Sequence, residues 1–165
     1  MTALLCTARQ YSDHTHGDPA DCLSLTYDNR FLRRKVLTCE SGEQILIDLA
    51  QTTSLNHGGA LVLDDGREVE IQAAPEVLLE VKAPDLTRIA WHIGNRHTPC
   101  QIAEDALFIR HDHVLAGMLR GLGAEVTEVT APFEPEGGAY GHGRTMGHDH
   151  GPDDSHSHSH GHSHD

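Results

Sequence analysis

The spacing of apolar and polar residues predicts a first half of the chain built from strands. The clearest pattern covers residues 60–73, where apolar side chains recur at every second position on both sides of Asp65 and Gly66: Leu61, Leu63, Val69 and Ile71. This pattern is typical of a β-hairpin, because glycine readily adopts the positive φ that a tight turn needs. A second hairpin is predicted around residues 40–42. We therefore expect a small all-β domain over residues 1–75.

The second half predicts two helices, each beginning at an aspartate that can accept hydrogen bonds from the free N–H groups of the first turn. Asp85 precedes the first helix and Asp112 precedes the second. Apolar residues follow at helical spacing: Leu86, Ile89, Ala90 and Ile93 in the first helix, and Val114, Leu115, Met118, Leu119 and Leu122 in the second. Gly94-Asn95 and Gly123 are expected to end the two helices.

Strand-like segments surround these helices, at residues 77–83, 100–105, 106–110 and 125–131. The resulting order, β-α-β-β-α-β, is that of the ferredoxin-like split βαβ unit. We therefore expect an α+β protein in which a ferredoxin-like domain, residues 76–140, follows the all-β domain, with Ala73-Ala74-Pro75 as linker. Because many unrelated functions use this fold, the order alone assigns none.

The apolar pattern ends at residue 141. Residues 141–165 consist almost wholly of His, Gly, Ser and Asp, with Met146 as the only large apolar side chain. Such a segment buries too little to offset chain entropy, so we expect a disordered tail. Imidazole binds zinc, copper and nickel alike, and the tail contains eight candidate ligands: His142, His148, His150, His156, His158, His160, His162 and His164. We interpret it as a natural metal-binding tail, because expression tags are usually unbroken histidine runs.

The formal net charge of −13 is distributed over the whole chain. Nucleic acid and anionic membranes need basic patches, so neither is an expected partner. A secretory signal and a membrane span are not visible, and we expect a cytoplasmic protein. The four cysteines lie too far apart to form a chelating pair, so we expect reduced, mostly structural thiols: Cys6, Cys22, Cys39 and Cys100.

Three histidines of the ferredoxin-like domain are candidate metal ligands. His97 lies in the loop after the first predicted helix, while His111 and His113 flank Asp112 and could hold a cation between them. These residues do not amount to a closed tetrahedral set. The spacing therefore favours an open, exchangeable site over a permanent structural zinc.

Other histidines fit simpler roles. His14 and His16 lie in a polar loop and could bind metal, but solvent-exposed loop residues are the favoured interpretation. His92 stands beside Trp91 on the first helix, and we expect it to pack against its neighbours.

Catalytic motifs are missing from the chain. The sequence contains no G-x-S-x-G, no P-loop, no H-E-x-x-H and no glycine-rich dinucleotide turn. A metal-dependent enzyme that uses His111 and His113 would also need a general base and a substrate pocket, and the sequence indicates neither. We therefore expect a protein that is not an enzyme.

Several segments together resemble the UreE family of urease accessory nickel metallochaperones. They are "LNHGGALVLDDGREVEIQAAPE", "GNRHTPCQI", "HDHVLAGMLRGLG", "PFEPEGGAYGHG" and the histidine-rich end, which cover most of the chain. The resemblance implies a β-domain suggested to bind partner proteins and a homodimer joined through the ferredoxin-like domain. It also implies Ni²⁺ as cargo, with Zn²⁺ or Cu²⁺ as metals bound in vitro; ligand chemistry alone could not select nickel.

The resemblance further implies roles for individual histidines. His97 is similar to the family's interface ligand, contributed once by each subunit, and His142 is placed to add a further ligand. The later tail histidines would provide reserve capacity, and His111 and His113 resemble a secondary site of some members. We therefore expect a homodimer that passes Ni²⁺ to the urease apoprotein through the accessory GTPase UreG. The alternative is a nickel store that acts mainly through its tail.

Overall fold

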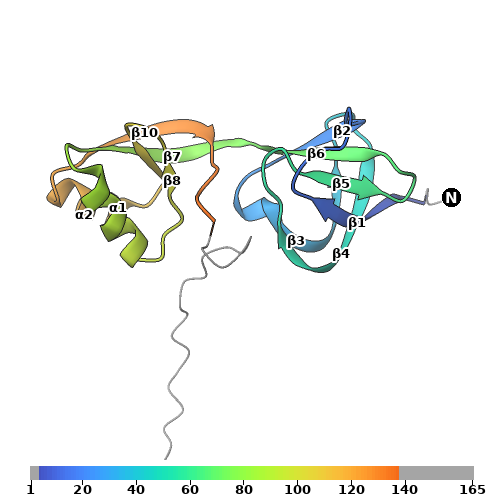
Figure 1. The fold of residues 1–165 in the computed structure, drawn as a ribbon, viewed down its shortest axis with the longest axis horizontal. Coiled ribbons are helices and arrows are strands. Elements are labelled where there is room, and N and C mark those ends of the chain that lie inside the picture. Colours follow the sequence, from blue (N-terminus) through green and yellow to red (C-terminus); the bar gives the residue numbers. More distant parts are fainter. Residues whose placement is uncertain (1–3, 138–165) are drawn as a thin grey trace, which may run out of the picture.

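The computed structural model describes residues 4–137 and shows two sheets that follow one another along the long axis of the molecule (Figure 1). The first half of the chain forms a six-stranded sheet of order β2-β6-β5-β1-β4-β3, and the second forms a four-stranded sheet of order β10-β7-β9-β8 with two helices. The predicted α+β class is confirmed. In chain order the elements are β1 (Cys6–Ser12), β2 (Asp21–Leu25), a 3-10 turn (Asp28–Arg30), β3 (Phe31–Thr38), β4 (Gln44–Ser54), β5 (Ala60–Leu63), β6 (Glu68–Ala73), β7 (Pro75–Lys82), α1 (Leu86–Asn95), β8 (Gln101–Ile102), β9 (Leu107–Arg110), α2 (His113–Gly121) and β10 (Glu125–Pro132).

Two hairpins organise the six-stranded sheet, as the alternation of apolar residues predicts. Strands β3 and β4 meet at a turn in which Gly42 has φ 93°, and β5 and β6 meet at a turn in which Gly66 has φ 88°. Both values lie in the left-handed region that glycine adopts without steric cost. The inward-facing residues of these strands are fully buried and include Ile45, Ile47 and Leu61.

The second sheet has the strand order of a ferredoxin-like fold, and α1 and α2 supply the helical half of its core. The predicted caps are present: Asp85 accepts from the backbone N–H of Arg88 at 3.2 Å, and Asp112 caps α2.

Three predictions about this half of the chain are corrected. Val114 is 64% exposed although the helical pattern placed it on the inner face; Leu115 and Ala116, the next two residues of the same turn, are buried in the core instead. The strand predicted at residues 100–105 covers only Gln101–Ile102, and Pro75 begins β7 rather than ending a linker.

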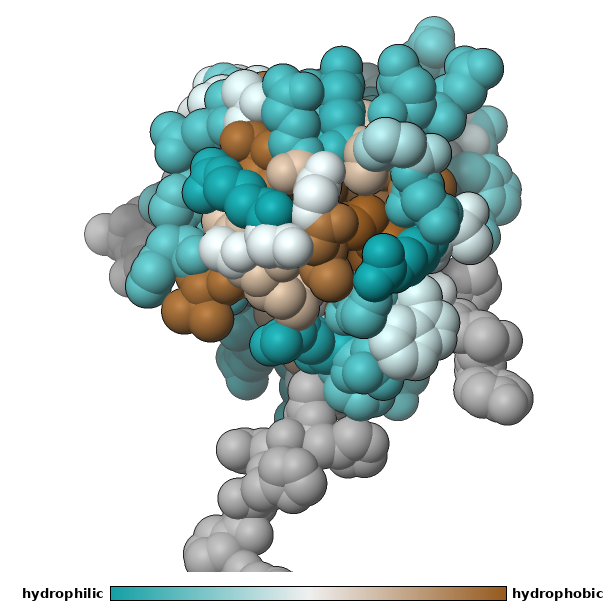
Figure 2. Space-filling view, turned by 90° about the vertical axis from the view of Figure 1, so that its left-hand side faces the viewer, coloured by the Kyte–Doolittle hydropathy of each residue, from teal (hydrophilic) through white to brown (hydrophobic). Residues whose placement is uncertain are grey.

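The free end of the ferredoxin-like domain has an apolar centre. Figure 2 looks at this end and shows brown, apolar side chains gathered in the middle of a face that is ringed by hydrophilic residues. The large hydrophobic side chains of this domain that remain exposed are Trp91, Ile102, Val114 and Val77. Contiguous exposed apolar surface on a folded domain commonly marks a contact with another protein.

Hydrogen bonds and an aromatic contact connect the two halves of the molecule. Only Ala74 separates β6 from β7, and its N–H donates to the carbonyl of Leu25 at 2.9 Å. Arg30, 4% exposed, donates from Nη1 to the same carbonyl at 3.1 Å and from Nη2 to the carbonyl of Phe133 at 2.6 Å. The ring of Phe133 is fully buried and meets the ring of Tyr27 edge-on at 5.4 Å. The segment after β10 is thereby held against the first domain.

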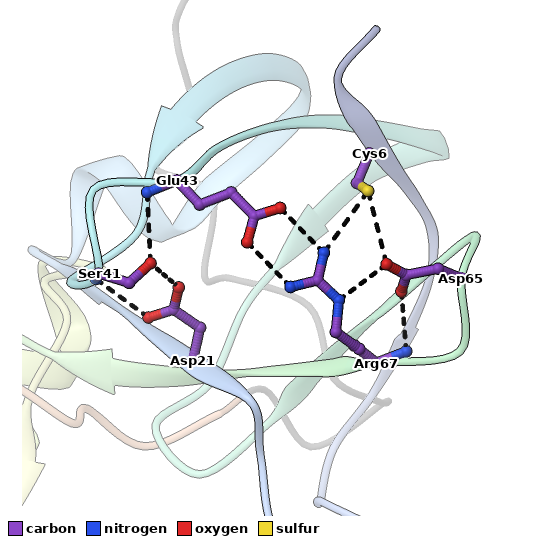
Figure 3. Close-up of polar contacts among 6 residues, drawn as sticks. All are labelled: Cys6, Asp21, Ser41, Glu43, Asp65 and Arg67. Carbon is purple, nitrogen blue, oxygen red and sulfur yellow. Dashed lines mark hydrogen bonds and ion pairs between the residues drawn. The ribbon is translucent and has the colours of Figure 1, made fainter. Parts of the chain in front are cut away.

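A polar network ties together the turns at the outer end of the β-domain (Figure 3). Arg67 forms two parallel bonds of 2.9 Å with Glu43 and one of 2.7 Å from Nε to Asp65, and its Nη2 lies 3.5 Å from the Cys6 sulfur. The bonds from Arg67 hold the pKa of Glu43 below its ordinary value, and the pKa of Asp65 is lowered first by the backbone N–H of Arg67 and then by its guanidinium. Beside this network, Asp21 accepts from the hydroxyl of Ser41, and that bond lowers the pKa of Asp21.

Candidate metal site

His97 has an unusual backbone conformation in the loop after α1. Its φ is 55°, the only positive value at a non-glycine residue in the described range 4–137. Its N–H donates to the carbonyl of Gly94 at 3.0 Å, and this bond closes the turn that follows the helix. The residue as a whole is exposed. A left-handed conformation at a residue with a Cβ carries a cost, and such residues cluster at functional sites.

Cys100, three residues later, is not suited to bind metal. Burial raises the pKa of its thiol to about 11, and the nearby carboxylate of Glu136 adds to the effect. A thiol must lose its proton to become a good ligand, so Cys100 remains protonated near neutral pH. The half-buried side chain fits the structural role that the sequence predicts, although it lies just before β8 rather than within a strand.

The backbone around Cys100 has a second role, because it fastens the segment that leads to the tail. The N–H of Glu136 donates to the carbonyl of Cys100 at 2.9 Å, and the N–H of Glu134 donates to Oε1 of Gln101 at 2.9 Å. With Phe133 buried against Tyr27, the segment is held at three successive points. The residues that precede the tail therefore run beside the segment that follows His97.

The sequence indicates one part of this anchoring. Phe133 is a lone aromatic residue between prolines at positions 132 and 135, in a segment that looks extended, and is available to pack on the domain. Gln101 carried no such signal, because a glutamine side chain that accepts one backbone bond leaves no pattern in the sequence.

His111 and His113 lie on either side of Asp112, as predicted, but they have different surroundings. The Nε2 of His111 lies 3.4 Å from a carboxylate oxygen of Glu128, and His113 is the first residue of α2. Asp112 acts as the cap: its Oδ1 accepts from the N–H groups of residues 114 and 115 at 2.9 and 3.0 Å. All three residues are exposed.

Within residues 4–137, no group of three or more His, Cys, Asp or Glu side chains is arranged to hold a metal ion. His97, His111 and His113 are therefore not gathered into one complete site by a single chain. The other predicted ligands lie outside the described residues: His142, His148, His150, His156, His158, His160, His162 and His164. Any complete metal site that uses His97 needs further donors, from the tail or from a second copy.

The fold and this arrangement define a two-domain α+β protein in which a ferredoxin-like domain presents histidines to solvent and is followed in the sequence by a histidine-rich segment. Comparison with known proteins gives the family. The model described as "UreE urease accessory protein, N-terminal domain" matches residues 4–74, and the model for the C-terminal domain of the same protein matches residues 70–165. The chain belongs to the UreE family of urease accessory proteins.

Individual relatives agree with the family models. A urease accessory protein UreE of Ruegeria sp. (strain TM1040) is 61% identical over 146 residues, which cover 88% of this chain and 83% of the relative. The UreE proteins of Cereibacter sphaeroides and Ruegeria pomeroyi are each 62% identical, over 136 and 130 residues. These matches cover 82% and 79% of this chain, and 74% and 87% of the respective relatives.

Neither helix in the described part of the chain is long and apolar enough to cross a membrane.

Proposed function

We propose that this protein is a cytoplasmic nickel metallochaperone that binds Ni²⁺ as a homodimer and delivers it for assembly of the urease active site. Membership of the UreE family supports a role in urease maturation. The observation that carries the nickel proposal is the position of His97. His97 is exposed, has a strained backbone and lies three residues before Cys100, the carbonyl of which binds the N–H of Glu136; the eight histidines follow Glu136 in the sequence.

Chain length allows His142 to reach His97. His142 lies six residues beyond Glu136, and an extended chain spans at most about 3.5 Å per residue, so the reach is about 20 Å. His97 lies three residues before Cys100, the carbonyl of which fixes Glu136. A tail histidine can therefore complete a site at His97, and the later tail histidines can act as reserve ligands.

The homodimer is proposed because one imidazole from the folded part of one chain is too few for a metal site. A two-fold contact would bring two His97 side chains to the same axis. Trp91, Ile102 and Val114 are exposed hydrophobic side chains of the ferredoxin-like domain, and such a contact would cover side chains of this kind. Burial of apolar area is the main driving force in most protein association.

Ligand exchange is the proposed mechanism of delivery. In an open site with additional donors from the histidine-rich segment, one imidazole is replaced at a time, so Ni²⁺ moves to the next protein without release into water. The proposed recipients are the accessory GTPase UreG and the urease apoprotein complex. No catalytic step is required of this chain, and we propose that it is not an enzyme.

The metal is not chosen by imidazole chemistry, because a nitrogen site of this kind binds Cu²⁺ more tightly than Ni²⁺. We propose Ni²⁺ as the cargo in the cell, with Zn²⁺ and Cu²⁺ as competing metals in vitro. His111 and His113 are proposed as a secondary site.

Calorimetric titration of Ni²⁺ tests the proposal. The proteins are the full chain, His97→Ala, His92→Ala as a matched control from the same domain, and a chain that ends at Tyr140. We expect the full chain and the control to have one tight site per dimer, His97→Ala to lose it, and the shortened chain to keep tight binding with fewer additional sites. If tight binding disappears with the tail and does not depend on His97, the protein is a nickel store.

A further inference from the structure

We propose that the loop between β1 and β2 contains a second metal site, in which His14 and His16 bind one divalent first-row transition-metal ion through their Nε2 atoms. This site lies in the β-domain, apart from His97. A test of this site is therefore independent of the proposed chaperone function.

The loop that carries the two histidines is fixed at both ends. Its preceding strand ends at Ser12, and the following strand begins at Asp21. The backbone N–H of His16 donates to both carboxylate oxygens of Glu68, at 3.0 and 3.3 Å, and the N–H of Ala20 donates to the carbonyl of the same residue at 2.9 Å. The backbone of the loop is therefore held on β6 at His16 and Ala20.

Each imidazole has a carboxylate at its Nδ1 atom. Nδ1 of His14 lies 2.6 Å from Oδ1 of Asp13, and Nδ1 of His16 lies 3.4 Å from Oε2 of Glu68. A carboxylate at this position favours the tautomer with a proton on Nδ1, which leaves the lone pair of Nε2 available. Histidine ligands in metalloproteins commonly show this arrangement, because the carboxylate orients the ring and makes it a better donor.

The distance between the two rings fits coordination of a single ion. Their centroids are 4.6 Å apart, with 48° between the ring planes. A metal–nitrogen bond of about 2.1 Å places a ring centre about 3.3 Å from the metal, so two neighbouring ligands have ring centres roughly 4.5 to 5.5 Å apart. The observed separation lies within this range.

Charge and access also favour a cation. The side chains of His14 and His16 are 67% and 60% exposed, and neither Nε2 atom has a hydrogen bond to any residue that the structure describes. Asp13 and Glu68 add negative charge next to the rings, which attracts cations and raises their local concentration. Two nitrogen donors form an incomplete site, so water fills the remaining positions and the ion exchanges readily.

Nuclear magnetic resonance of the full-length chain, labelled with ¹⁵N in histidine, tests this inference. Zn²⁺ is the probe because it is diamagnetic, and the ring signals are assigned with His14→Gln and His16→Gln. We expect the Nε2 signals of both residues to shift together along one titration curve, while their Nδ1 atoms keep the proton. Each single substitution should remove most of the response of the remaining partner.

Asp13→Asn provides a matched variant that keeps a hydrogen-bond acceptor but removes the charge. We expect it to weaken Zn²⁺ binding at this pair about tenfold, as is typical when the carboxylate behind a histidine ligand is removed, and to leave the His97 response unchanged. The inference is overturned if the His14 and His16 signals do not move at a Zn²⁺ concentration that saturates the other histidines. It is also overturned if the two signals respond independently.

Discussion

At the scale of single residues, His97 combines a metal-binding side chain with a backbone conformation that most residues avoid. Its φ of 55° places the Cβ atom close to the following carbonyl oxygen, which costs roughly 1 to 2 kcal/mol. Glycine has no Cβ and does not meet this cost. Substitution of His97 by alanine therefore removes the imidazole and keeps the backbone strain, whereas substitution by glycine removes both.

We expect His97→Gly and His97→Ala both to lose tight nickel binding. The free energy of unfolding should be about 1 kcal/mol higher for the glycine variant than for the alanine variant. Urea unfolding followed by circular dichroism measures the difference. Arg96, with φ −94°, provides the control: at this position alanine should be at least as stable as glycine. Equal stability of the two His97 variants would show that the loop carries no strain.

At the scale of secondary-structure elements, Arg67 links the β3–β4 turn to the β5–β6 turn through Glu43 and Asp65. The pKa values of both carboxyl groups are lowered in the folded protein, chiefly by hydrogen bonds from Arg67. A lowered carboxyl pKa stabilises the fold at pH values above the ordinary pKa of the group, and this stability is lost as the pH falls through the folded value.

Arg67→Met should therefore lower the urea midpoint at pH 7, and the difference from wild type should shrink as the pH falls below about 4. We expect a modest effect, because all three side chains are more than one third exposed. Arg9→Met is the control, since Arg9 has no ion pair within residues 4–137. A difference that stays constant between pH 7 and pH 3 would contradict the prediction.

Local patterns predicted most elements because each depends on neighbouring residues. The hairpins at Gly42 and Gly66 and the aspartate caps of both helices appear as expected. The predictions that were wrong concern where a side chain lies in the folded domain, which neighbouring residues in the sequence do not determine. Val114 has helical spacing, yet its side chain is exposed, while Leu115 and Ala116 of the same turn are buried in the core.

The candidate site was predicted only in part for the same reason. His97 is a candidate ligand from the sequence, since it lies in a loop after a recognisable helix, and its role as a ligand stays a prediction. The hydrogen bonds that hold residues 134–136 against the segment after His97 join positions more than 30 apart in the sequence: Glu136 with Cys100 and Glu134 with Gln101. Such contacts leave no periodic signal. The carboxylates that orient His14 and His16 likewise became visible only in three dimensions.

At the scale of the whole molecule, Arg30 joins two segments 103 residues apart in the sequence. Its guanidinium is buried, and burial lowers its pKa, while the carboxylates of Glu76 and Glu134 oppose this shift. The two carbonyl groups that it satisfies belong to different domains, at Leu25 and Phe133. Loss of this side chain would remove the donor of the Phe133 carbonyl and leave the Leu25 carbonyl with only the N–H of Ala74.

We expect Arg30→Met to reduce the free energy of unfolding by about 2 kcal/mol, because the carbonyl of Phe133 loses the donor given by Arg30 and the carbonyl of Leu25 loses one of its two donors. Arg110→Met is the control, since Arg110 is 38% exposed and pairs with Asp28 at 2.7 Å; its loss should cost less than about 1 kcal/mol. Urea unfolding of both variants measures the difference. Equal costs would mean that Arg30 does not stabilise the domain contact.

The junction at Ala74 has a consequence for cleavage of the chain. Proteases cut preferentially at exposed loop tips, where the backbone can leave its hydrogen bonds. Here a single residue lies between β6 and β7, and its N–H is bonded to the carbonyl of Leu25. Limited digestion should therefore leave the two domains covalently joined after other exposed segments have been cut, so that they persist as one fragment.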